Sequence, residues 1–119
     1  MYSICTRGQD NRYKLWEVSG MEDFLGKKLI EAAEEGNLRR VGKLLDGGVN
    51  VNSEDSYGET ALMKAAGKGH TEIVNKLIEK GASLDSEDIY GETALMKAAG
   101  EGHTETVEKL IEKGAKLDL

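Results

Sequence analysis

Two histidines and one cysteine are the residues of this chain that could most readily bind a metal ion or transfer a proton near neutral pH. His70 and His103 lie 33 positions apart, each just before a predicted helix, whereas Cys5 lies in a separate N-terminal segment. A structural metal site needs roughly four convergent ligands, which these residues do not supply. A single cysteine also excludes an intrachain disulfide. We therefore predict that the chain has no metal site.

No other pattern in the sequence is typical of catalysis or of cofactor binding. The chain has no nucleophile, base and orienting acid at an interpretable spacing, no P-loop and no dinucleotide-binding glycine motif. We predict that it is not an enzyme and has neither catalytic nor cofactor-binding residues. Its 15 glycines separate predicted helices instead.

The composition indicates one folded, acidic domain. The 119 residues are 32% charged and carry a net charge of -6, with 13 basic against 20 acidic residues over positions 21–119. Such a surface disfavours nucleic acid and anionic membranes as partners. The chain has neither a signal-like segment nor an apolar run of about 18 residues, so we expect no membrane span and a cytoplasmic protein, or a recombinant one if engineered.

The chain is internally repetitive. Residues 53–85 and 86–118 are one 33-residue unit with five substitutions, namely Ser56/Ile89, Lys68/Glu101, Ile73/Thr106, Asn75/Glu108 and Ser83/Lys116. A weaker copy precedes them at the same spacing and shares Leu29, Ala32, Ala33, Gly36, Val41, Leu44, Leu45 and Gly48. The sequence therefore contains three copies.

Each copy predicts two helices followed by a loop. The first helix begins after Thr60, whose hydroxyl can cap free amides, and ends at Gly67 and Gly69. The second spans residues 71–80 and is closed by Gly81 as a left-handed cap. Its apolar stripe consists of Ile73, Val74, Leu77 and Ile78. The following residues are rich in Asp, Ser and Gly, which predicts a turn or a hairpin-like loop.

One copy cannot bury its apolar stripe alone, but about three stacked copies share a continuous core. We predict an all-α fold, a solenoid of three stacked helix-turn-helix repeats with projecting loops. Neighbouring helices should approach closely at three pairs of small residues, Ala32–Ala33, Ala65–Ala66 and Ala98–Ala99.

The motifs G-x-T-A-L-M-x-A-A, G-H-T-E and V-x-x-L-I-x-x-G-A resemble the ankyrin repeat over residues 25–119. The resemblance implies L-shaped helix pairs, protein binding, and histidines that hydrogen-bond neighbouring loops. One departure is Thr-Ala-Leu-Met at 60–63 and 93–96 in place of Thr-Pro-Leu-His, which removes the family's Thr-to-His bond. We divide the chain into an appendage at 1–20 and a repeat domain at 21–119, with repeats at about 25–57, 58–90 and 91–119.

Partner contacts in ankyrin proteins lie on the loop tips and on the first helix of each pair. By matching positions, the resemblance assigns partner binding to Ser56, Tyr57, Glu59, Lys64, Lys68, Ile89, Tyr90, Glu92, Lys97 and Glu101. Tyr57 and Tyr90 are the strongest candidates, because a tyrosine on a rigid loop offers a large contact area. The alternative is that both tyrosines only pack against adjacent loops.

The two ends of the chain differ from the central repeat. The first copy is rich in Lys, Glu and Arg, which is typical of an N-terminal cap. Thr106 and Glu108 are expected to make the terminal face of the last copy soluble; either they suffice as a cap or a longer array has been truncated. An uncovered C-terminal repeat would allow self-association. Residues 1–20 predict a hairpin from Tyr2 to Val18, a flexible leader or a peptide grafted for recognition.

These patterns leave two main hypotheses for function. The first is a protein-binding module whose partner, another protein, is not identified by the sequence. The second is an engineered or consensus-like repeat scaffold without a natural partner, which the near-identity of two copies favours, although a recent duplication would look the same.

Overall fold

The computed structural model describes residues 21–115, with side chains from Phe24 onwards. Its helices are α1 (Met21–Glu35), α2 (Leu38–Asp46), α3 (Ala61–Lys68), α4 (Thr71–Glu79), α5 (Ala94–Gly100) and α6 (Thr104–Glu112). Residues 21–115 contain no strand, only an isolated bridge between Glu54 and Thr60. The predicted all-α repeat fold is confirmed. The appendage predicted at residues 1–20 lies outside the described residues.

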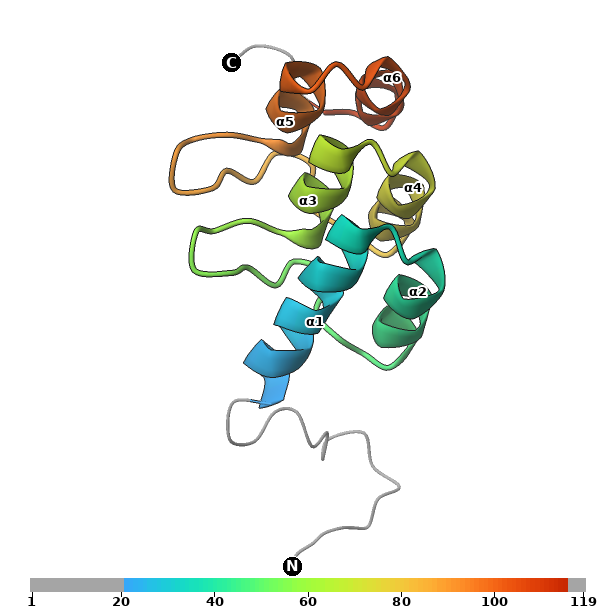
Figure 1. Ribbon diagram of the computed structural model, residues 1–119, viewed down its shortest axis with the longest axis vertical. Helices are drawn as coiled ribbons and strands as arrows, with labels where there is room; N and C mark the ends of the chain where they lie inside the picture. Colours follow the sequence, from blue (N-terminus) through green and yellow to red (C-terminus); the bar gives the residue numbers. More distant parts are fainter. Residues whose placement is uncertain (1–20, 116–119) are drawn as a thin grey trace, which may run out of the picture.

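The helices form antiparallel pairs that stack side by side, and each pair contributes one helix to each of two layers (Figure 1). α1, α3 and α5 make one layer, in which α3 packs between the other two, and α2, α4 and α6 make the second. The two loops that precede α3 and α5 project from the first layer on the side away from the second. This arrangement leaves the first helices and the loop tips on one face of the stack. Over the described residues, no helix has the length and apolar character needed to span a membrane.

The first helices begin and end where local chemistry requires it. Thr60 and Thr93 cap α3 and α5, because each hydroxyl oxygen accepts a backbone N–H three residues later at 3.3 Å. Gly69 ends α3 with a φ of 76°. The prediction that Gly67 also ends the helix is wrong, since α3 continues to Lys68. One glycine in a helix costs only about 1 kcal/mol, which a packed helix tolerates.

The core lies between the layers and along the rows of helices. In α4 the side chains of Ile73, Val74 and Leu77 are buried, as the stripe predicted. The alanine pairs of the first two repeats are fully buried, and so is Ala98. Ala99 is exposed, so the expectation of close helix contact there is wrong. In the described part of the chain, no further helix packs on the outer side of α5.

The two histidines join successive repeats. Nε2 of His70 is 3.1 Å from the carbonyl oxygen of Glu34, and Nε2 of His103 is 3.1 Å from that of Gly67. The acceptors lie near the ends of α1 and α3, in the preceding repeat, rather than in loops. Each ring also lies against a glycine: a Cβ added to Gly69 would come within 2.7 Å of the His103 ring. Both histidines therefore have structural roles.

Thr106 is a second contact between repeats and not part of a soluble end face. Thr106 occupies the position that Ile73 has in the previous repeat, and both side chains are buried. The hydroxyl groups of Thr106 and Thr71 lie 2.8 Å apart and form a hydrogen bond between α6 and α4. The expectation that Thr106 helps to solubilise the end of the stack is wrong, because this side of α6 faces α4. Glu108 is exposed.

Candidate partner-binding surface

Each projecting loop is held in shape by one aspartate. Oδ1 of Asp88 accepts the backbone N–H of Tyr90 at 2.9 Å and that of Glu92 at 3.0 Å. Asp55 does the same in the preceding loop, for the residues two and four positions later, both at 2.9 Å. The aspartate side chain thereby fixes a tight turn that the backbone alone would leave open.

The loop tips carry an apolar surface. The backbone N–H of Ile89 donates to the carbonyl oxygen of Tyr57 at 2.9 Å, so the two loops lie side by side. At these tips Tyr57, Ile89 and Tyr90 are 53%, 62% and 71% exposed. We refer to Tyr57, Ile89 and Tyr90 as the tip patch.

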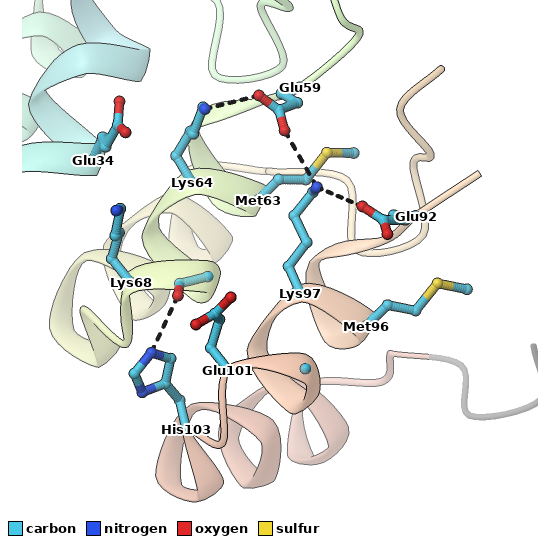
Figure 2. Close-up of a pocket in the computed structure, with 12 residues that line it drawn as sticks. Glu34, Glu59, Met63, Lys64, Lys68, Glu92, Met96, Lys97, Glu101 and His103 are labelled. Atoms are coloured by element: carbon cyan, nitrogen blue, oxygen red, sulfur yellow. Dashed lines mark hydrogen bonds and ion pairs between the residues drawn. The ribbon is translucent and has the colours of Figure 1, made fainter. Parts of the chain in front are cut away.

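Lys97 holds the two loops together from below. Its ammonium group lies 2.9 Å from Glu92, 3.0 Å from Asp88 and 3.2 Å from Glu59 (Figure 2). Lys64, one repeat earlier, lies 2.8 Å from the other carboxylate oxygen of Glu59. Glu59 is therefore shared by lysines of two repeats. We refer to these ion pairs as the Lys97 network.

Burial and pairing act in opposite directions on the charges of this network. Desolvation alone would lower the pKa of Lys97, but its hydrogen bonds to three carboxylates outweigh this and raise the pKa above the ordinary value. Desolvation alone would raise the pKa of Asp88, but the N–H of Glu92, the Lys97 ammonium and the N–H of Tyr90 together lower it. Among the described residues, the only partner of Asp88 Oδ2 is the Lys97 ammonium group, at 3.0 Å.

A groove of about 620 Å³ runs along α1, α3 and α5 below the loops. Met63 and Met96 are among its lining residues, and most of the others are charged. Lys64 and Lys97 are tied to Glu59 and Glu92 along one side of the groove. Across the groove lie three further charged residues that form no ion pair in the described part of the chain, namely Glu34, Lys68 and Glu101 (Figure 2).

The ten residues assigned to partner binding from the sequence therefore fall into three groups. Four lie at or beside the exposed tips: Ser56, Tyr57, Ile89 and Tyr90. Four belong to the ion-paired network: Glu59, Lys64, Glu92 and Lys97. Two are exposed at the groove and form no ion pair with any described residue: Lys68 and Glu101.

Sequence reasoning missed Asp55, Asp88 and Glu34. Asp88 shapes its loop and pairs with Lys97, and Glu34 contributes a charge to the groove from the first repeat. The signal for Asp88 was present, because an aspartate stands two residues before Tyr-Gly-Glu at the start of each loop tip in both copies. Glu34 carries no such signal, since the first copy diverges from the others.

The converging charges of this surface are paired with one another. The three carboxylates that converge do so on the ammonium group of Lys97. Among residues 21–115 no cluster of His, Cys, Asp or Glu is arranged to hold a metal ion. The available chemistry is apolar contact at the tips and ionic contact along the groove.

Comparison with known proteins gives one family match. A family model described as ankyrin repeats matches residues 29–119 in 3 copies. None of the curated proteins matches the chain. Repeats of this family generally act as protein–protein interaction modules and are typically non-enzymatic.

Proposed function

Because the chain belongs to the ankyrin repeat family, we propose that it is a protein-binding module that holds its partner on the tip patch and on the first-helix side of the groove. One observation carries the proposal: Tyr57, Ile89 and Tyr90 expose most of their surface on loops whose shape is fixed by hydrogen bonds. Rigid aromatic side chains bind at low entropic cost, and they are enriched among residues that dominate binding energy.

The Lys97 network supports this function by ordering the loops before a partner arrives. Association is weakened when loops must be immobilised on binding, so a surface that is already ordered binds more tightly for the same contacts. The excess of acidic residues over positions 21–119 makes a protein a more suitable partner than nucleic acid or an anionic membrane.

The tip patch can be tested by capturing proteins from a cell lysate on the immobilised chain. If two tyrosines anchor the partner, the double variant Tyr57→Ala/Tyr90→Ala should no longer capture it. The Kd of the complex should rise by about 30-fold or more, as for residues that dominate an interface. Leu38→Ala is a matched control, because Leu38 is an exposed apolar residue on α2, outside the groove lining. A partner that binds the tyrosine variant as tightly as the unmodified chain contradicts the proposal.

A second candidate is an engineered or consensus-like scaffold that has no natural partner. It is favoured by the two adjacent repeats, which differ at only five of 33 positions. The same lysate capture separates the two candidates: a chain of high stability that retains no protein supports the scaffold, and a partner lost on tyrosine substitution supports the binding module.

A further inference from the structure

We propose that the groove binds an extended segment of a partner protein that carries an acidic and a basic side chain about three residues apart. The acidic side chain lies against Lys68 and the basic one against Glu101. This inference rests on the proposed function and specifies the chemistry of the partner. It concerns the groove and not the tip patch, so the two can be tested separately.

The first observation is a reversal of charge between two nearly identical repeats. Of the five positions that differ between residues 53–85 and 86–118, only the pair Lys68 and Glu101 exchanges a positive charge for a negative one. Two further differences have other settings: Ile73 and Thr106 are buried between helices, and Ser56 and Ile89 lie at the tips. The one reversal of charge therefore falls on the groove, between repeats that share 28 of their 33 residues.

The second observation is that packing does not account for this reversal. Lys68 and Glu101 are both exposed, and neither forms an ion pair among the described residues. Lys64 and Lys97, in contrast, keep the same charge in both copies and hold the loops through Glu59 and Glu92. The groove thus has one side committed to internal pairing and another whose charges face solvent (Figure 2).

The spacing of the helices sets the spacing required in the partner. Lys68 ends α3 and Glu101 follows α5, and these helices pack side by side. Packed helix axes lie roughly 8–10 Å apart, and an extended chain rises about 3.3 Å per residue, so one helix spacing corresponds to about three residues. Glu34, at the other side of Lys68 on α1, would receive a second basic residue about three positions beyond the acidic one.

Charge pairing in such a groove favours one partner over another more than it adds affinity. A segment with the opposite pattern would place like charges together, and like-charge contacts are penalised.

The test is selection from a display library of random ten-residue peptides on the immobilised full chain. Peptides enriched on the unmodified chain should carry an acidic and a basic residue three positions apart. Lys68→Glu should deplete the acidic residue, and Glu101→Lys the basic residue, each by about fivefold, the effect of one favourable exposed charge pair. Lys113→Glu and Glu79→Lys are matched controls, since both residues are exposed at the second-helix layer.

Three outcomes would overturn the inference. They are enrichment of peptides without the charge pair, a pattern unchanged in both groove variants, and no enrichment at all. An unchanged pattern would mean that Lys68 and Glu101 chiefly neutralise each other. The proposed function is judged separately by the effect of Tyr57→Ala/Tyr90→Ala on lysate capture. Circular dichroism of every variant confirms that it is folded.

Discussion

At the scale of single residues, the buried Asp88 couples the stability of the fold to pH. Its carboxylate is buried, its pKa is lowered, and its charge is matched by Lys97, whose pKa is raised. The lowered pKa of Asp88 stabilises the fold above its unfolded value of about 3.9, and this contribution is lost as pH falls through the folded pKa. The raised pKa of Lys97 also stabilises the fold. This contribution is fully present below the unfolded pKa of about 10.4, and it is lost only as pH rises through the folded pKa.

We predict that Asp88→Asn lowers the free energy of unfolding at pH 7 and makes it less sensitive to acid. The amide keeps an oxygen that can accept the N–H groups of Tyr90 and Glu92, but it removes the charge that pairs with Lys97. The difference from the unmodified chain should therefore shrink as pH falls below about 4. Urea unfolding followed by circular dichroism between pH 3 and pH 7 measures it.

Asp46→Asn is the control for this experiment. Asp46 is exposed and pairs with Lys80 at 3.7 Å, so its loss should leave the pH dependence almost unchanged. If Asp88→Asn and the unmodified chain lose stability in parallel as pH falls, the buried pair does not contribute as proposed.

At the scale of helices, the left-handed glycines that follow α3 and α5 differ in what surrounds them. Gly69 and Gly102 have nearly the same left-handed backbone, with φ of +76° and +78°. A Cβ on Gly69 would meet the His103 ring at 2.7 Å, whereas a Cβ on Gly102 would meet nothing within 4 Å. The first position is covered by the next repeat and the second is open.

We predict that Gly102→Ala lowers the free energy of unfolding by about 1–2 kcal/mol, because alanine is strained in the left-handed conformation. Gly69→Ala should lower it clearly more. The additional loss comes from displacing His103 and its contact with the carbonyl oxygen of Gly67. Denaturant unfolding of the two variants measures both losses. The two values can be compared directly, because the two glycines have nearly the same backbone conformation. Equal losses would show that the histidine ring moves aside without cost.

The period of the sequence was sufficient to predict the helices and their stacking. Thr60 as a cap, Gly69 as a stop and the buried stripe of α4 all follow from local chemistry that repeats every 33 residues. The limits of that reasoning appear where two repeats meet. The side of a helix that faces its neighbour cannot be read from one copy, which is why Thr106 was misplaced on the end face.

The candidate site was predicted less completely than the fold, for the same reason. Lys97 was assigned to partner binding, but it pairs with three carboxylates, and one of them, Glu59, comes from the preceding repeat. Contacts between loops depend on how the repeats stack, and the sequence of one loop does not contain that information. The sequence placed Tyr57 and Tyr90 on loops, and both are exposed, because the exposure of a loop tip follows from the loop itself.

At the scale of the whole molecule, no described helix covers the outer side of α5 and α6, which we call the end face. Ala66 is fully buried by the next repeat, but its counterpart Ala99 is exposed, and Ile111 at this end is 39% exposed. Exposed apolar surface of this kind is a site for association. Its limited extent points to a weak contact.

We predict concentration-dependent self-association with a Kd on the order of 1 mM, or about -4 kcal/mol. Sedimentation equilibrium up to millimolar concentration measures it. Ile111→Lys should abolish the association by placing a charge on the end face, whereas Leu38→Lys, an equivalent change on α2, should not. A monomer at every concentration would mean that the end face is not adhesive.

The bridge that Lys97 makes between two loops also affects how binding data on this protein should be interpreted. Truncation of Glu59 or Lys97 would loosen both loops and shift tyrosines that the substituted residue never touches. An alanine scan would then identify these positions as strong contributors even if no partner atom approached them. Crosslinking, or hydrogen exchange in the bound state, would locate the true footprint without that confusion.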